Sequence, residues 1–373
     1  MLRPKLRVGL IGTGFMGKAH ALAYSAAPRL FDLGVEIELH TVADIDELSA
    51  HSIARSHGFS HVTRNWRHVT ENTEIDIVSI TAPNALHKEM ALAAIATGKH
   101  VYCEKPLAPQ TREAEELTRA AEAASIKTQV GFNYLCNPMF ALARDMISAG
   151  ELGEIYSYRG LHAEDYMANS ESPYTFRHDP DGGGALADLG SHALATAEFF
   201  LGPITEVMGD CVTVISERPE KGHRRRAVLV DDIGRAFLRF ANGASGSIEG
   251  NWIATGRKMQ HDFEIHGSKG AIGFSQEHLN ELHFYSAGDS VGQQGFRRIE
   301  ASPDHPPYGR FCVAPGHQIG FNDLKTIEAA GFLTAIAKDE AEPFNFRAGM
   351  RIQNLVSHIQ QSARARQWLT VEN

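Results

Sequence analysis

Three side chains in two short segments have the types and spacing that proton transfer to or from an alcohol requires. Lys105 lies in Glu104-Lys105-Pro106, directly after an apolar stretch, and Asp188 and His192 lie four positions apart after a run of glycines. When a hydride leaves a secondary alcohol, another group must take the hydroxyl proton, and a lysine or a carboxylate-oriented imidazole suits this task. The sequence therefore indicates Lys105, Asp188 and His192 as catalytic candidates and leaves open which of Lys105 and His192 is the base.

Each of these residues also has a purely structural interpretation. Lys105 alone is compatible with an exposed lysine, and Asp188 with His192 is compatible with an ordinary pair on one face of a helix that begins near Gly184. An Asp and a His at this spacing can also bind a metal ion, but no third ligand is fixed by the spacing. We therefore expect no metal site.

A glycine-rich loop near the N-terminus indicates a nucleotide. The segment Gly12-Thr13-Gly14-Phe15-Met16-Gly17 follows an apolar stretch and precedes a segment of helical composition. In this order Gly12 permits a tight turn, Gly14 lets the backbone approach a pyrophosphate, and Gly17 lets the helix meet the strand. The helix N-terminus then faces the anion. The loop predicts dinucleotide binding.

Asp44 selects the kind of dinucleotide. It closes the apolar segment Glu36 to Ala43, where a carboxylate can accept both ribose hydroxyls and would repel a 2′-phosphate. We therefore expect NAD as the cofactor. The spacing from Gly17 exceeds the usual ~20 residues, and a loop insertion over Ala26 to Gly34 would absorb the difference. The alternative is that the glycines form only a turn and that Asp44 caps the next helix.

Short apolar segments alternate with helical ones through the first third of the chain. This alternation predicts a doubly wound parallel sheet of the Rossmann type in a first domain, residues 1–132. Its strands are expected at Leu6 to Ile11, Glu36 to Ala43, Asp76 to Thr81, His100 to Cys103 and Lys127 to Gly131, and its helices at Lys18 to Ser25, Asp46 to His57, Ala85 to Thr97 and Arg112 to Ala124.

From residue 133 the pattern changes to alternating segments separated by glycine-rich turns. It predicts a second, α+β domain, residues 133–373, with a large, mostly antiparallel open sheet, and C-terminal helices that pack back towards the first domain. Its strands are expected at Glu154 to His162, Ile204 to Ser216, Asp232 to Phe240, Ala244 to Trp252 and Asp262 to His266, and its helices at Phe140 to Ser148, Leu186 to Leu201, Asn322 to Asp339 and Gly349 to Gln367.

Composition narrows the partners of the chain. Its 36 Lys and Arg against 45 Asp and Glu give a formal charge of -9 over 373 residues, so nucleic acid is not an expected partner. No segment reaches the roughly 18 apolar residues that a membrane helix needs. The four cysteines lie far apart and without a C-x-x-C spacing, which favours a reduced, cytoplasmic protein.

These motifs together resemble one protein family. The glycine loop, Thr81-Ala82-Pro83-Asn84 with His87, Glu104-Lys105-Pro106, Gly131-Phe132-Asn133 with Pro138, Gly184 to His192, and Phe321-Asn322-Asp323 look like those of the Gfo/Idh/MocA oxidoreductases. The resemblance covers nearly the whole chain. Within the family it is nearest to the inositol and sugar dehydrogenases.

The resemblance implies residue roles and an assembly. It places catalysis on Lys105, Asp188 and His192, Asn133 near nicotinamide and substrate, and Glu104 near the cofactor. It also implies an open sheet that packs copies into a homodimer or homotetramer. The expected cofactor-binding residues are Gly12, Gly14, Phe15, Met16, Gly17, Asp44, Thr81, Pro83, Asn84, His87, Glu104, Lys105 and Asn133. The expected substrate-binding residues are Lys105, Asn133, His162, Arg177, Asp188, His192 and His317.

Two positions depart from the family pattern. Ala195 stands where many relatives carry an acidic residue, and Phe176 stands where they often carry Trp. These departures concern the substrate contacts and leave the reaction class unchanged.

The leading hypothesis is an NAD-dependent oxidoreductase that transfers a hydride between nicotinamide and a secondary hydroxyl of a cyclic polyol or sugar. One alternative is glycoside cleavage through transient oxidation and elimination, and another is a non-catalytic NAD-binding sensor. The sequence leaves the sugar, the hydroxyl, the direction and the size of the oligomer open.

Overall fold

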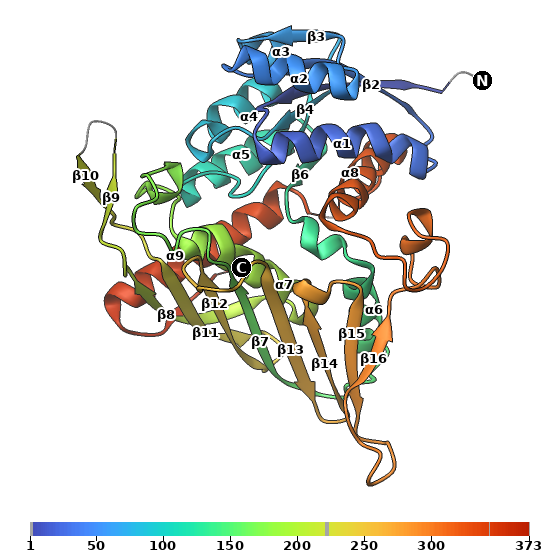
Figure 1. The fold of residues 1–373 in the computed structure, drawn as a ribbon, viewed down its shortest axis with the longest axis vertical. Coiled ribbons are helices and arrows are strands. Elements are labelled where there is room, and N and C mark those ends of the chain that lie inside the picture. Colours follow the sequence, from blue (N-terminus) through green and yellow to red (C-terminus); the bar gives the residue numbers. More distant parts are fainter. Residues whose placement is uncertain (1–2, 221–223, 343, 373) are drawn as a thin grey trace. The chain divides into compact units, whose positions relative to one another are not determined.

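The computed structural model describes residues 3–220, 224–342 and 344–372, and the chain divides into two compact units (Figure 1). Unit 1 comprises Met1–Cys136 and Gly320–Met350, and unit 2 comprises Asn137–Ile319 and Arg351–Asn373. Unit 1 therefore includes a C-terminal segment that is far from the rest of the unit in sequence.

Unit 1 is built on a six-stranded parallel sheet with the order β3-β2-β1-β4-β5-β6. This order, which reverses between β1 and β4, is that of a doubly wound Rossmann sheet, so the predicted Rossmann fold is confirmed. The strands are β1 (Lys5–Ile11), β2 (Glu36–Ala43), β3 (His61–Thr63), β4 (Ile77–Ile80), β5 (His100–Cys103) and β6 (Thr128–Val130).

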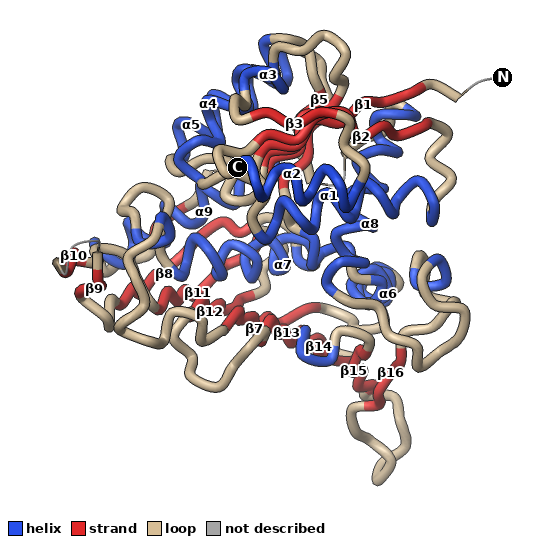
Figure 2. The backbone as a smooth tube through the Cα atoms, turned by 45° about the horizontal axis from the view of Figure 1, so that its top comes forward, coloured by secondary structure: helices blue, strands red, loops and turns tan. Residues whose placement is uncertain are grey.

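Helices cover both faces of this sheet, with α1 and α2 on one side and α4 and α5 on the other (Figure 2). The helices of unit 1 are α1 (Phe15–Leu30), α2 (Glu47–His57), α3 (Arg67–Thr70), α4 (His87–Ala96), α5 (Thr111–Ala123), α8 (Phe321–Lys338) and the short turns η1 (Asn84–Leu86) and η2 (Asn133–Cys136).

Helix α1 is longer than the sequence predicts. The expected loop insertion over residues 26–34 is wrong, because the helix continues through Pro28 to Leu30. Ala27 is fully buried, so the last turn of α1 contributes to the core. In that core Tyr24 packs in one cluster with Phe332 and Leu333 of α8, and this cluster fixes α8 on unit 1.

Unit 2 contains a nine-stranded sheet with the order β16-β15-β14-β13-β7-β12-β11-β8-β17. Among the described strands of this sheet only β7 and β12 pair in parallel, so the predicted mostly antiparallel sheet is confirmed. The strands are β7 (Ile155–Ala163), β8 (Ile204–Val212), β11 (Ile233–Phe240), β12 (Ser245–Asn251), β13 (Gln260–Gly267), β14 (Gly270–Ser275), β15 (Glu281–Ser286), β16 (Arg297–Glu300) and β17 (Leu369–Thr370).

One face of the nine-stranded sheet carries helices, and α7 lies along its middle strands (Figure 1). A separate hairpin of β9 (Glu217–Pro219) and β10 (Arg225–Ala227) projects from the unit. The remaining elements are α6 (Pro138–Ser148), α7 (Ser191–Leu201), α9 (Phe346–Ala365), which runs from unit 1 into unit 2, and the short turns η3 (Phe176–His178), η4 (Leu186–Gly190), η5 (Gln276–His278) and η6 (Tyr308–Arg310).

The segment that carries Asp188 and His192 is not one regular helix. Leu186–Gly190 forms a π-helical turn, and the α-helix begins only at Ser191. Asp231 caps this turn, since its Oδ2 accepts the Leu186 N–H at 2.7 Å. A Cβ at Gly250 of β12 would lie 2.6 Å from the Gly190 nitrogen, so the turn packs directly on the sheet. Composition predicts a helix here but does not reveal the wider turn.

The described part of the chain contains no helix that is both long and apolar enough to cross a membrane. The four cysteines, Cys103, Cys136, Cys211 and Cys312, are free thiols.

Candidate functional site

The glycine loop of unit 1 leaves open space at the N-terminus of α1. Gly12 has a φ of +97°, and a Cβ at this position would lie 2.8 Å from the backbone of Thr81. A Cβ at Gly17 would lie 2.2 Å from the carbonyl oxygen of Gly12, so both positions require glycine. In contrast, a Cβ at Gly14 would meet no atom within 4 Å. The first turn of α1 has no side-chain cap, so its N–H groups suit a phosphate.

Neighbouring side chains hold this loop in place. The Thr81 hydroxyl donates to the carbonyl oxygens of Ile11 and Gly12, each at 3.0 Å. Phe15 is 72% exposed, and its ring tilts against Phe321 of α8 with centroids 5.4 Å apart. Met16, the residue after Phe15, is half-buried.

Asp44 follows β2 and is anchored by the loop itself. Its Oδ2 accepts the backbone N–H and the hydroxyl of Thr13, both at 2.7 Å, and its Oδ1 accepts the N–H of Asp46 at 2.8 Å. The cap of α2 is Asp46, which accepts the Ser49 N–H, so Asp44 does not have that role. Ile45 and the nearby Leu48 are 82% and 83% exposed and offer an apolar surface beside Asp44. These groups fit the ribose and adenine of a dinucleotide.

Lys105 follows β5 on a loop whose backbone is held by a hydrogen bond to the Glu104 side chain. The Glu104 side chain is only 7% exposed. Its Oε2 accepts the Lys105 backbone N–H at 3.3 Å, and its Oε1 lies 2.9 Å from His20 Nε2 and 2.8 Å from Lys325 Nζ. A Cβ at Gly131, just after β6, would lie 2.4 Å from Glu104 Oε1, so the backbone there packs directly against this carboxylate. We name His20, Tyr102, Glu104, Lys325 and Glu328 the Glu104 cluster.

His87 ties the Lys105 loop to the loop after β4. Its Nδ1 lies 2.8 Å from the carbonyl oxygen of Pro106, and its Nε2 lies 2.8 Å from that of Ala82. The ring is 1% exposed, and burial lowers the pKa of His87. Pro83 is exposed and Asn84 half-buried at the start of η1, beside this junction.

Asn133 begins the turn after β6 and is 3% exposed. Its buried Nδ2 has no hydrogen-bond partner within the residues that the structure describes. A buried amide donor without a protein partner is costly, so this atom is suited to a ligand. With Gly14 and Asp44 it shows that the residues present fit a bound dinucleotide.

In unit 2, Asp188 is held by two side chains from a preceding loop. The Tyr166 hydroxyl donates to Asp188 Oδ2 at 2.6 Å, and Arg177 Nε donates to the same oxygen at 3.0 Å. The guanidinium of Arg177 also lies 4.7 Å from the ring centroid of Phe176. We name Tyr166, Arg177 and Asp188 the Asp188 cluster. Tyr166 and Arg177 therefore both donate to the same oxygen of Asp188.

His192 lies in a cluster of three imidazole rings formed with His162 and His261, the histidine cluster. The rings of His162 and His261 are stacked, with centroids 4.8 Å apart and planes 10° apart, and His192 lies 5.4 Å from His162. His162 Nε2 lies 3.0 Å from Glu164 Oε1, and His261 Nε2 lies 3.1 Å from Thr196 Oγ1. Burial lowers the pKa of His261 well below its usual value, so that ring is neutral.

The structure distributes the predicted residues between the two units. Lys105, Asn133 and the nucleotide loop belong to unit 1, whereas Asp188 and His192 belong to unit 2. His317 is exposed on the chain segment before α8. Within the described ranges, no group of three or more His, Cys, Asp or Glu residues could hold a metal ion.

Sequence reasoning missed several of the groups in these clusters. Tyr166 lies in an irregular loop, where no periodicity marks it. Lys325 lies 221 residues from its partner Glu104. A lysine and a glutamate three apart on a helix would ordinarily indicate an exposed pair, so nothing in the local pattern reveals that Lys325 and Glu328 are buried.

Two family models match this chain. The GFO/IDH/MocA model described as an oxidoreductase family with an NAD-binding Rossmann fold matches residues 6–132, and that of the GFO/IDH/MocA C-terminal domain matches residues 140–273. Levoglucosan dehydrogenase of Pseudarthrobacter phenanthrenivorans is 37% identical over 98% of this chain and 98% of its own length. Inositol 2-dehydrogenase of Rhizobium meliloti is 28% identical over 72% of this chain and 74% of its own length.

A solved structure of levoglucosan dehydrogenase in complex with NADH and levoglucosan is 38% identical to this chain. It superposes with a TM-score of 0.95 and covers 99% of this chain and 100% of its own. The predicted resemblance, the Rossmann fold and NAD as the cofactor are therefore confirmed.

Proposed function

This chain belongs to the GFO/IDH/MocA oxidoreductase family, and we propose that it transfers a hydride between NAD and a secondary hydroxyl of a cyclic sugar or polyol. One observation carries the proposal. The glycine loop, Asp44 and Lys105 follow β1, β2 and β5 of one parallel sheet and so share its carboxyl edge, where ligands of such sheets bind. Levoglucosan, the ligand named for the similar solved structure, is the first substrate to test.

The chain's own residues divide the work on the nucleotide. The N–H groups at the start of α1 would receive the pyrophosphate, and Asp44 would accept the ribose hydroxyls. The unpartnered amide of Asn133 would donate to the nicotinamide or the substrate. When bound, NAD accepts the hydride from the alcohol carbon. Gly14 provides the open space that the pyrophosphate needs.

We assign the proton transfer to Lys105, because it lies on the unit that carries the nucleotide loop. Its backbone is fixed by Glu104 and by the His87 bridge to Pro106. Asp188, which accepts from Tyr166 and Arg177, would accept a substrate hydroxyl, and His192 would orient the substrate alcohol. His162 would act on His192 through ring packing, and Arg177 would act through Asp188. His317 is proposed only as an outer substrate contact.

The test is NADH formation. The purified chain is mixed with NAD and with levoglucosan, inositols or hexoses, and absorbance of NADH is followed. We expect turnover on at least one member, and its loss in Lys105→Met but not in Lys338→Met, a change at an exposed lysine. Retention of bound NAD without turnover on any member would refute the proposal. Aglycone release from a glycoside without net NADH would favour oxidation-coupled cleavage instead.

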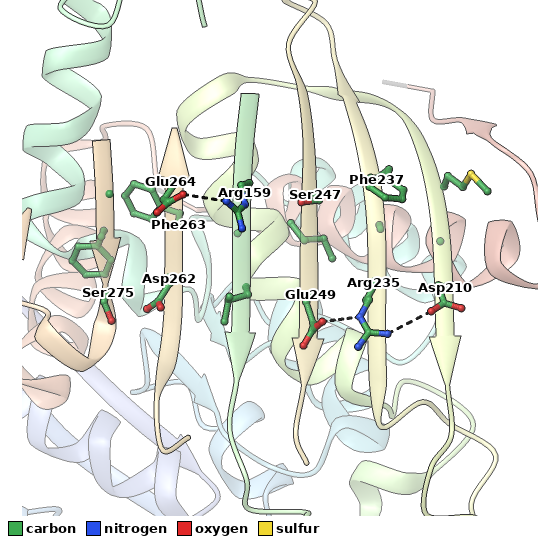
Figure 3. A pocket seen from close by; sticks show the side chains of 18 of the residues that line it. Arg159, Asp210, Arg235, Phe237, Ser247, Glu249, Asp262, Phe263, Glu264 and Ser275 are labelled. Atoms are coloured by element: carbon green, nitrogen blue, oxygen red, sulfur yellow. Dashed lines mark hydrogen bonds and ion pairs between the residues drawn. The ribbon is translucent and has the colours of Figure 1, made fainter. Parts of the chain in front are cut away.

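The open face of the nine-stranded sheet is the proposed interface between copies. It contains a hollow of about 860 Å³ crossed by the ion pairs of Arg235 with Glu249 at 2.7 Å and Arg159 with Glu264 at 3.5 Å (Figure 3). Phe237, beside them, is 62% exposed. Light scattering of the wild type should show a dimer or tetramer, and Phe237→Glu should shift it towards the monomer. A monomeric wild type would contradict this assembly.

We propose a cytoplasmic location for this chemistry. The four free thiols support a reducing compartment, because oxidising ones favour disulfides. Cell fractionation should place the chain with cytosolic markers. Recovery with extracytoplasmic markers would contradict this proposal.

A further inference from the structure

The Lys105 loop packs against the Glu104 cluster, whose charged side chains are buried. The side chains of Lys325 and Glu328 on α8 are both 0% exposed. Lys325 Nζ lies 2.8 Å from Glu104 Oε1, 2.6 Å from Glu328 Oε2 and 3.1 Å from the Tyr102 hydroxyl. That hydroxyl in turn donates to Glu328. A single ammonium therefore touches two carboxyl groups and a phenol in the interior of unit 1.

His20 completes the cluster as a neutral donor. Its Nε2 faces the Glu104 carboxylate at 2.9 Å, and its Nδ1 faces the Ser79 hydroxyl at 2.7 Å. Since a carboxylate only accepts, Nε2 carries the proton and Nδ1 accepts from Ser79. Burial, together with the charge of Lys325, lowers the pKa of His20 to about 4. At neutral pH the positive charge that balances Glu104 therefore resides on Lys325.

We propose that Lys325 is a positioning residue for the reaction: its ammonium keeps Glu104 a carboxylate, and Glu104 fixes the backbone that presents Lys105. This inference rests on the proposed function for the role of Lys105. The charge relation between Lys325 and Glu104 stands independently of it. No contact of Lys325 with substrate or cofactor is required.

Removal of the ammonium would force the folded protein to take up a proton. A carboxylate in the interior without a cation is strongly disfavoured. Without Lys325 the folded state would bind a proton at Glu104 itself or at His20, which would then form an ion pair with Glu104. In either case the hydrogen bonds below the Lys105 loop rearrange.

Other titratable groups face the cluster and enter the same balance. Burial raises the pKa of Glu328, whereas the charge of Lys325 acts in the opposite direction. Burial raises the pKa of the Tyr102 hydroxyl and of the Cys103 and Cys136 thiols well above their usual values, so these groups are neutral. The full set of titratable groups that face the cluster's charged side chains is Tyr24, His87, Tyr102, Cys103, Lys105, Cys136 and Glu328.

The stability of the wild type and that of Lys325→Met should change with pH in opposite directions. In the wild type, Lys325 and His20 hold the pKa of Glu104 far below its usual value against the effect of burial, so this group stabilises the fold above about pH 4.3 and loses that effect as pH falls. In Lys325→Met the folded state holds an extra proton, so its stability falls as pH rises. The deficit in Tm of the variant relative to the wild type should therefore grow with pH.

The experiment compares Lys325→Met with Lys338→Met, a change at an exposed lysine of the same helix. Tm is measured between about pH 5.5 and about pH 8.5, in the absence of substrate. We expect the Tm deficit of Lys325→Met to grow across this range and that of Lys338→Met to stay constant. In Lys325→Met kcat/KM should fall about 100-fold, as for a small displacement of a catalytic group.

One further variant keeps the test decisive. The double variant Lys325→Met/Glu104→Gln removes both charges, and its Tm should lose the pH-dependent deficit of the single variant; it also serves if the single variant does not fold. A Tm deficit of Lys325→Met that is constant with pH, with kcat/KM within twofold of the wild type, would overturn the proposal. If the wild type itself lacks activity, the proposed function fails while the Tm comparison still decides the charge relation.

Discussion

The Glu104 cluster of unit 1 and the Asp188 cluster of unit 2 contain the same three kinds of group in opposite surroundings. Each joins a carboxyl group, a tyrosine hydroxyl and a cationic side chain. In the first, the side chains of Lys325 and Glu328 are 0% exposed. In the second, those of Arg177 and Asp188 are 39% and 19% exposed.

This difference in exposure suits the two clusters to different tasks. The buried Glu104 cluster stabilises a loop, whereas the more exposed Asp188 cluster is accessible to a ligand. Breaking a fully buried pair costs about 3–5 kcal/mol because a charge is left without a partner, whereas an exposed pair contributes about 0–1 kcal/mol. Changes in the Glu104 cluster should therefore appear mainly in stability and its pH dependence. Changes in the Asp188 cluster should appear mainly in turnover.

The largest effect is expected at Asp188. Asp188→Asn keeps the size of the side chain but removes the charge that Arg177 and Tyr166 face. We expect kcat/KM for the best sugar to fall about 100- to 1,000-fold, with a change in unfolding free energy of about 1 kcal/mol or less. Steady-state kinetics and urea denaturation measure the two quantities. A large loss of stability with nearly normal turnover would reverse the proposed comparison.

A buried carboxyl group without a cation gives the opposite pH behaviour. Burial raises the pKa of Asp231 from 3.8 to about 6. A raised pKa means that its stabilising effect is complete below about pH 3.9 and is lost as pH rises through the folded value, at a cost of ~3 kcal/mol. Asp231→Asn should therefore gain stability relative to the wild type as pH rises. Denaturation curves that shift in parallel for both proteins at all pH values would exclude this titration.

Tyr102 of the Glu104 cluster and Tyr166 of the Asp188 cluster allow the same substitution, Tyr to Phe, to be compared in both clusters. Tyr102→Phe removes a donor to Glu328 and an acceptor for Lys325, so it should cost about 1–3 kcal/mol of unfolding free energy. The measurement is urea denaturation at neutral pH. An unchanged midpoint would show that the buried hydroxyl contributes nothing to the Glu104 cluster.

The smallest effect is expected for Tyr166→Phe. This variant loses one hydrogen bond to Asp188, so kcat/KM should fall about fivefold to tenfold while Tm stays unchanged. Kinetics and a thermal melt test both parts. A fall in Tm without a fall in kcat/KM would place Tyr166 among the purely structural residues.

The local parts of this molecule could be predicted from the sequence. The need for glycine at positions 12 and 17 follows from backbone sterics, and the place of Asp44 follows from the end of β2. Five strands of the nine-stranded sheet, β7, β8, β11, β12 and β13, follow from alternation and glycine turns, whereas β14 to β17 were not predicted. The full length of α1 could not be predicted in this way. A proline such as Pro28 ordinarily indicates the end of a helix, but α1 continues to Leu30 with Ala27 buried in the core.

Contacts between distant segments could not be predicted. The pairing of Lys325 with Glu104 depends on how α8 packs against α1, which no local pattern encodes. Tyr166 reaches Asp188 from an irregular loop. The π-helical turn at Leu186–Gly190 depends on the Asp231 cap and on close packing against Gly250, both set by the folded sheet.

The proposed reaction transfers a hydride directly from the sugar to NAD. Levoglucosan deuterated at its ring carbons is incubated with the chain and unlabelled NAD, and the NADH formed is analysed by mass spectrometry. We predict one deuterium in each NADH and a slower turnover than with unlabelled levoglucosan. NADH that forms without deuterium would contradict direct transfer from a ring carbon.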